Sequence, residues 1–168
     1  IMDGLIDPRF FGAMPDQGEL SARLTATLSD ANSYEEFLDR LRLFGQESLF
    51  LIGTRILSGT VSAQQAGVAF ADVAEGIVHT VDRLVMGQFA EQYGRIKDQE
   101  TAIVAMGKLG SREMTASSDL DLILIYDFDH ESPDSNGARP LHGSQYFARL
   151  TQRLISAFTT RTNYGVLY

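Results

Sequence analysis

The residues of this chain that are best suited to chemistry lie between positions 107 and 122. Gly107-Lys108-Leu109-Gly110-Ser111 follows a short apolar run, and Asp119-Leu120-Asp121-Leu122 comes after a spacer of seven residues. Side chains two apart on a strand point to the same face, so we expect the Asp119 and Asp121 carboxylates to project together. Two such carboxylates repel each other unless a cation lies between them, and Mg²⁺ prefers carboxylate and phosphate oxygens. The pair therefore predicts a magnesium site.

The glycine-rich segment predicts a turn that binds phosphate. Glycine lets backbone N–H groups approach an anion closely, and the Ser111 hydroxyl adds a donor beside Gly110. Lys108 could add a positive charge. Each motif is common by chance, but a strand, a Gly-Ser turn, a short spacer and an Asp-x-Asp strand in this order are more specific. A metal beside phosphate donors indicates phosphoryl or nucleotidyl transfer.

Other candidate residues have a simpler interpretation. Asp127 and Asp129 form a second Asp-x-Asp, but they open an acidic loop rich in proline and glycine, which favours a solvated segment. His79 is interpreted as a surface residue of a helix, and no histidine accompanies a nucleophile motif. The chain has no cysteine, which excludes thiol nucleophiles, cysteine-ligated zinc and iron–sulfur clusters.

Composition limits the partners of the chain. Its 168 residues have a formal net charge of −8 and a pI near 4.8, which argues against nucleic-acid binding through a basic face. The longest apolar runs are far shorter than the ~20 residues of a membrane-spanning helix. With no cysteine and no signal peptide, we expect a cytoplasmic protein without a membrane partner. Both ends look cut, so we expect a fragment of a longer protein.

Hydrophobic spacing and caps predict the elements that hold these residues. Three amphipathic helices are expected, beginning after Asp16, after a Ser33–Glu36 capping box and after Ser62, and the last two end at Gly59 and Gly94. Strands are expected over 102–106 and 120–126, then a loop, a helix from Ser144, and a third strand from Val166. The fold class is α+β, with a helical region over 1–97 and a partial sheet domain over 98–168.

The motif order resembles the nucleotidyltransferase superfamily that includes DNA polymerase beta. More narrowly, Ala105 to Met114 and Ser117 to Ile123 resemble glutamine synthetase adenylyltransferase, also called glutamate–ammonia-ligase adenylyltransferase. Phe158 to Tyr168 resembles the following segment of the C-terminal of that enzyme's two catalytic copies. Leu5 to Phe11 and the helices after it resemble the helical region before that copy. The resemblance covers nearly the whole chain.

The resemblance implies a truncated nucleotidyltransferase sheet and a function in nitrogen assimilation. The family transfers AMP from ATP to a tyrosine of glutamine synthetase, and its other copy removes AMP by phosphorolysis. Glutamine and the PII signalling protein set the balance. Asp119 and Asp121 would then be catalytic metal ligands for Mg²⁺, Gly110 and Ser111 would hold the triphosphate of the substrate ATP, and Lys108 would lie in the same block.

Two departures from the family pattern matter for activity. The family usually has glycine where this chain has Ser111, although the wider superfamily uses serine there. The third carboxylate of such sites follows the Gly-x-Leu-Tyr segment, and this chain ends at Tyr168. We therefore expect the 168 residues alone to be inactive. Two alternatives are another nucleotidyltransferase and a catalytically silent module that senses nucleotide or docks a partner.

Overall fold

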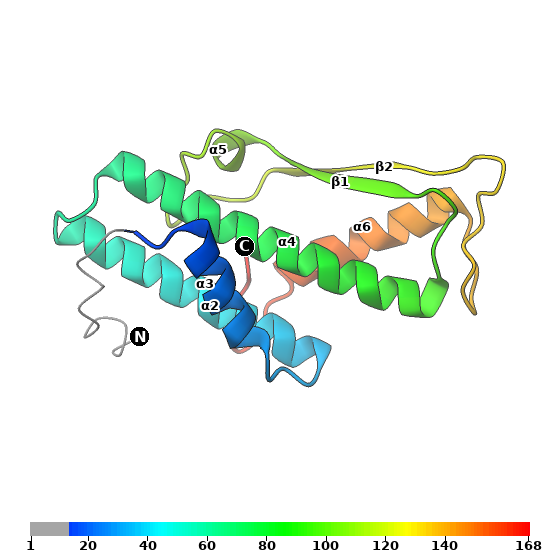
Figure 1. Ribbon diagram of the computed structural model, residues 1–168, viewed down its shortest axis with the longest axis horizontal. Coiled ribbons are helices and arrows are strands. Elements are labelled where there is room, and N and C mark those ends of the chain that lie inside the picture. The colour runs from blue at the N-terminus through cyan, green and yellow to red at the C-terminus, as the bar shows by residue number, and fades with distance from the viewer. Residues whose placement is uncertain (1–13) are drawn as a thin grey trace.

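The computed structural model describes residues 14–168, and the Leu5–Phe11 segment lies outside them. Figure 1 shows an α+β arrangement in which β1 and β2 run along the long helix α4, with α6 beside them. The predicted fold class is confirmed. In chain order the elements are α2 (Gln17–Leu28), α3 (Tyr34–Leu57), α4 (Ala63–Tyr93), β1 (Glu100–Ala105), α5 (Gly107–Gly110), β2 (Leu122–Asp127) and α6 (Gly143–Thr159).

The starts of the first three described helices follow the predicted caps, with one difference. Asp16 caps α2 through Glu19 N, and Ser62 forms a full capping box with Gln65 at the start of α4. The predicted capping box at Ser33 is wrong in its second half. Ser33 Oγ accepts from Glu36 N at 3.1 Å, but the Glu36 carboxylate accepts from Asn32 N at 3.0 Å instead of the Ser33 amide. Glu36 also binds Arg40, which draws its side chain away from Ser33.

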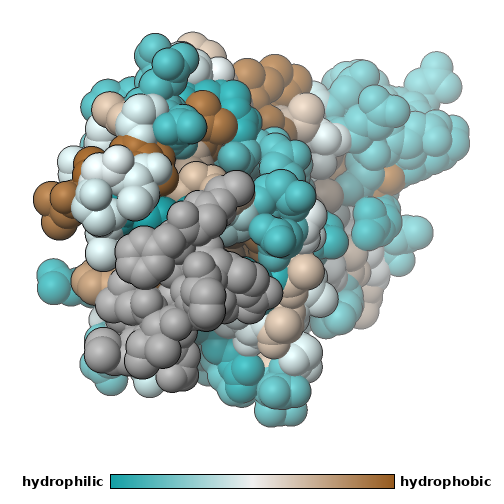
Figure 2. Space-filling model, turned by 60° about the vertical axis from the view of Figure 1, so that its left-hand side comes forward, coloured by the Kyte–Doolittle hydropathy of each residue, from teal (hydrophilic) through white to brown (hydrophobic). Residues whose placement is uncertain are grey.

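A single hydrophobic cluster joins the helices to the sheet. The buried side chains of α4 recur at helical spacing and pack against α2, α3 and α6. Among the coloured residues on the face seen in Figure 2, hydrophilic ones predominate and hydrophobic groups are scattered. No helix within residues 14–168 combines the length and the apolar character needed to cross a membrane.

The sheet consists of β1 and β2, paired antiparallel from Glu100 opposite Asp127 to Ala105 opposite Leu122. Burial alternates over the first residues of both strands, since Ile103 and Leu124 pack against the cluster whereas Ala102 and Ile123 are exposed, and the last residues of each strand are exposed on both faces. β1 begins two residues before its predicted start and ends one residue early, whereas β2 begins two residues after its predicted start and ends one residue late. Pairing ends at Leu122 because the chain leaves β1 for the α5 turn directly after Ala105 and Met106.

The third strand predicted from Val166 is wrong for the described residues. Residues 166–168 have no sheet partner, and the Leu167 and Tyr168 amides both donate to Phe158 O, at 3.2 and 3.3 Å. Burial raises the pKa of the Tyr168 phenol to about 12. The segment therefore folds back on the end of α6, and Leu167 and Tyr168 pack against the hydrophobic cluster while Val166 stays exposed.

The predicted helix after the acidic loop is confirmed as α6, and its aromatic residues attach it to β2 and α4. Phe147 is fully buried and stacks on Tyr126 of β2 with a ring-centroid distance of 4.1 Å. Tyr146 meets Phe89 of α4 edge to face at 4.8 Å. Such aromatic pairs contribute about 0.5–1.5 kcal/mol beyond the area they bury. These aromatic contacts of α6 therefore link β2 to α4.

Arg42 of α3 is a buried cation that fixes the chain after α6. Its guanidinium is 3.0 Å from Asp39 Oδ1 and donates to Thr160 O at 2.9 Å. Asp39 Oδ1 also accepts from Thr162 Oγ1 at 2.9 Å. A buried charge is tolerated only with such partners. The helical region thereby holds the turn at 160–165.

Replacing Asp39 by asparagine is expected to destabilise the fold strongly, because it leaves the Arg42 charge buried without a counter-ion. We expect a loss of about 3 kcal/mol and a Tm lower by about 6–12 °C. Thermal unfolding monitored by circular dichroism measures it. Glu36→Gln, which breaks the exposed pair with Arg40, is the control, and its loss should stay below about 1 kcal/mol. Equal losses in the two variants would contradict this account of Arg42.

Candidate functional site

The two aspartates of the Asp-x-Asp motif lie where the chain enters β2. Both are exposed, and both precede the first paired residue, Leu122. Met106 N donates to Asp121 O at 2.8 Å, so Asp121 continues the ladder by one bond, whereas Asp119 lies beyond it. Alternation along β2 assigns Asp121 to the exposed face of the sheet, with Ile123. Strand alternation therefore gives the direction of the Asp121 side chain. That the Asp119 side chain projects to the same face stays a prediction.

Asp121 and the start of the glycine-rich segment form one depression. Met106, Gly107 and Asp121 line it together with Leu120, Leu122 and Ile123, and its volume is about 490 Å³. The Asp121 carboxylate lies directly against Gly107, because a side chain built at Gly107 would collide with Asp121 Oδ2. The structure thus brings Asp121 to the glycine-rich segment. Asp119, Gly110 and Ser111 do not line this depression.

The predicted phosphate turn is a single helical turn, α5, that ends at Ser111. The Gly110 amide donates to Met106 O and the Ser111 amide donates to Gly107 O, both at 3.0 Å. The Ser111 hydroxyl is 3.1 Å from Glu113 Oε2, and Lys108 is exposed. The two amides and the Ser111 hydroxyl are thus all engaged within the segment, so a phosphate at this turn would meet the exposed Lys108 charge first. The binding roles of Lys108, Gly110 and Ser111 stay predictions.

Both glycines of the turn are required by close approach. Gly107 has φ +52°, a conformation that costs other residues roughly 1–2 kcal/mol. A Cβ on Gly110 would come within 2.7 Å of Ala105 O, so this glycine lets α5 pack on the end of β1. The glycines therefore set the position of the turn relative to Asp121.

The carboxylates at this site fit a hard divalent cation in chemical type. Within residues 14–168, neither the Asp119 nor the Asp121 carboxylate has an ion pair or a side-chain hydrogen bond, so both can accept a ligand. Mg²⁺ is held in proteins by one or two carboxylates, with waters and substrate phosphates completing its shell. No group of three or more acidic or histidine side chains suited to a metal occurs among the described residues.

The residues set aside in the sequence have structural roles. Asp129 pairs with Lys97 at 2.9 Å, and this hydrogen bond lowers the pKa of the Asp129 carboxyl. Asp127 Oδ1 accepts from the Phe128 amide at 2.9 Å. His79 lies on the surface of α4, 3.8 Å from Glu75. The second Asp-x-Asp thus stabilises the end of the sheet.

Sequence reasoning missed Arg112, which lies between the two motifs. Arg112 has φ +59°, and its guanidinium binds the carboxylates of Asp72 and Glu75 on α4. Burial lowers the pKa of the Arg112 guanidinium, but these hydrogen bonds raise it by more, so its pKa lies above the ordinary value. The only signal in the sequence was a pair of acids three apart on a helix.

Comparisons with known proteins agree with this motif order. A family model described as "Glutamate-ammonia ligase adenylyltransferase" matches residues 1–168. The relatives are named bifunctional glutamine synthetase adenylyltransferase/adenylyl-removing enzymes. Those of Rhodopseudomonas palustris strain HaA2 and Bradyrhizobium sp. strain ORS 278 are 87% and 81% identical to the chain over 168 residues. That of Xanthobacter autotrophicus strain ATCC BAA-1158 / Py2 is 54% identical over 169 residues.

These matches cover all of the chain and 17% of each relative, so the chain spans about one sixth of the length of the relatives it matches. The match of the family model extends through the helices as well as through the motifs. The resemblance drawn from the motif block is thereby confirmed. The chain belongs to the glutamate-ammonia ligase adenylyltransferase family.

Proposed function

We propose that this chain binds Mg·ATP and forms part of a site that transfers AMP from ATP to a tyrosine hydroxyl of glutamine synthetase. The observation that carries the proposal is the contact of the Asp121 carboxylate with Gly107, because it brings one aspartate of the Asp-x-Asp motif to the start of the glycine-rich segment. The names of the relatives supply the reaction class and glutamine synthetase as the target. Such a protein would act in the cytoplasm in the control of nitrogen assimilation, with PII as a regulatory partner.

Each residue of the site has a defined part in the proposal. Asp119 and Asp121 hold Mg²⁺, which when bound offsets charge on the phosphate oxygens. Ser111 and Lys108 meet the triphosphate, and Gly110 lets their turn pack close to β1. In the transfer, the tyrosine oxygen bonds to the α-phosphorus, the bond to pyrophosphate breaks, and a base takes the hydroxyl proton.

The chain supplies two of the three carboxylates that the family resemblance implies. The described residues hold the two aspartates, and no third carboxylate lies with them. Because residues 14–168 place no third acid with the pair to take the tyrosine proton, we expect the 168-residue chain alone to bind nucleotide without turnover. In the complete enzyme this segment would belong to the C-terminal catalytic copy.

Two measurements on the 168-residue chain test the proposal. Calorimetric titration should show ATP binding that strengthens with Mg²⁺, and incubation with glutamine synthetase and radiolabelled ATP should give no labelled product. ATP binding that is indifferent to Mg²⁺ would favour the silent nucleotide-sensing module. Absence of ATP binding would overturn the nucleotide site itself, and labelled glutamine synthetase would overturn the expected lack of turnover.

A further inference from the structure

The segment after the glycine-rich turn closes back on that turn. The Arg112 amide donates to Leu109 O at 3.1 Å, and the Glu113 amide donates to Lys108 O at 2.9 Å. The Ser111 hydroxyl also lies 3.1 Å from Glu113 Oε2. The turn and residues 112–113 therefore form one hydrogen-bonded unit, and whatever fixes Arg112 also fixes the turn.

That unit is fixed on α4, far away in the sequence. Arg112 Nη1 donates to Glu75 Oε2 at 3.1 Å, and Arg112 Nη2 donates to Asp72 Oδ1. The Asp72 side chain is 17% exposed, so this contact is partly shielded from water. Charge-assisted hydrogen bonds from one guanidinium to two carboxylates hold its plane in a defined orientation.

The surface of α4 fits the segment along its length. Gly67 lies beneath it, because a Cβ there would come within 3.4 Å of Arg112 O and 3.5 Å of Met114 O. Met114 is buried in the hydrophobic cluster at 3% exposure. An apolar anchor, a backbone contact and an ion pair thus attach residues 112–114 to α4 at successive points.

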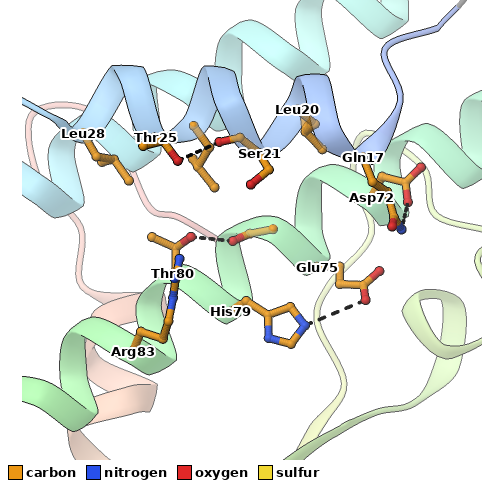
Figure 3. Close-up of a pocket in the computed structure, with 12 residues that line it drawn as sticks. Gln17, Leu20, Ser21, Thr25, Leu28, Asp72, Glu75, His79, Thr80 and Arg83 are labelled. Atoms are coloured by element: carbon orange, nitrogen blue, oxygen red, sulfur yellow. Dashed lines mark hydrogen bonds and ion pairs between the residues drawn. The ribbon is translucent and has the colours of Figure 1, made fainter.

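Asp72 Oδ1, which binds Arg112, also accepts a hydrogen bond from α2. Figure 3 shows the cleft between α2 and α4, in which Gln17 Nε2 reaches Asp72 Oδ1 at 3.1 Å. Asp72 therefore joins α2, α4 and the segment that carries Arg112. Through Asp72 and Arg112, α2 is thereby linked to the turn as well.

We propose that Asp72 and Glu75 are positioning residues that hold the Gly107–Ser111 turn against Asp121 through Arg112, and so set the affinity of the site for Mg·ATP. The inference rests on the proposed function and adds the helical layer to it. Neither acid lines the depression at Asp121. Their effect is exerted through the conformation of the turn.

The sign of the expected effect separates positioning from electrostatics. Removing the negative charges of Asp72 and Glu75 would by itself strengthen the binding of an anionic nucleotide. Loss of positioning predicts the opposite, about tenfold weaker Mg·ATP binding in the Asp72→Asn, Glu75→Gln variant, comparable to the loss of a residue that orients a metal ligand. Adding Arg112→Gln should then weaken binding little further, because the three side chains act as one unit.

The experiment is calorimetric titration of Mg·ATP into the 168-residue chain and its variants, with Tm measured for each. Asp129→Asn is the matched control, because Asp129 is 19% exposed and pairs with Lys97 at the far end of the strands. Its binding should equal that of the unaltered chain. If the double variant does not fold, Glu75→Gln alone, at a side chain 44% exposed, should weaken binding in the same direction.

Weaker binding in the Asp72 and Glu75 variants with an unaffected Asp129 control supports the inference. Unchanged or tighter binding overturns it and leaves the proposed function standing, since the unaltered chain still binds. No binding by the unaltered chain overturns both.

Discussion

Asp121→Asn is expected to weaken Mg·ATP binding about 100-fold, equivalent to about 2.8 kcal/mol. The substitution keeps the shape of the side chain but removes the charge that a hard cation requires. Asp121 is exposed and unpaired within residues 14–168, so its loss breaks no ion pair there, and Tm should change little. Asp119→Asn should act in the same direction. Titrations with and without Mg²⁺ measure both effects.

Asp127→Asn is the matched control for Asp121. This substitution removes the same charge at the other end of β2, and strand alternation assigns Asp127 to the same face as Asp121. Its Mg·ATP affinity should remain within about twofold of the unaltered chain, a difference of about 0.4 kcal/mol. If Asp121→Asn and Asp119→Asn still bind ATP as tightly as the unaltered chain, the metal-ligand assignment fails and the silent nucleotide-sensing module becomes the better interpretation.

Gly107→Ala is expected to damage both the fold and the site. Alanine at φ +52° costs roughly 1–2 kcal/mol, which should lower Tm by about 2–8 °C. Its Cβ would also occupy the position of Asp121 Oδ2 and push the carboxylate away from the turn. We therefore expect Mg·ATP affinity to fall at least about tenfold, an amount typical for a disturbed metal ligand.

Two further variants separate the strain from the collision. Gly107→Asn relieves part of the backbone cost, because asparagine tolerates the left-handed region, but its Cβ still meets Asp121. Compared with Gly107→Ala, this variant should lose less stability but as much affinity for Mg·ATP. Gly87→Ala in α4 meets nothing within 4 Å and should raise stability by up to about 1 kcal/mol without altering binding. Normal Mg·ATP affinity in Gly107→Ala would show that the contact with Asp121 is irrelevant to the site.

The helical layer was predictable because its signals are local. Ser62 and Gln65 are three residues apart, so the capping box that starts α4 can be read from adjacent positions and is formed. Gly94 ends the same helix with φ +75°, as expected for a glycine stop. The box at Ser33 failed for a reason outside that pattern, since Glu36 takes the Asn32 amide and the Arg40 side chain instead.

The strand boundaries and the attachment of the turn depended on distant contacts. β2 begins two residues later than its apolar pattern predicts, because pairing stops where β1 gives way to α5. The last residues have strand-forming side chains, yet Leu167 and Tyr168 hydrogen-bond to Phe158 O and pack against the hydrophobic cluster. Propensity indicates what a segment can form, and the available partner decides what it does form.

The sequence by itself determined the α+β class, the helix starts and the motif order that identifies the family, since these depend on spacings of a few residues. Only the tertiary structure joined Arg112 to Asp72 and Glu75, which lie 40 and 37 positions away, and placed Asp121 against Gly107. Such contacts depend on how α4 and the sheet pack. The type of a charged residue does not indicate which oppositely charged residue, distant in the sequence, will lie beside it.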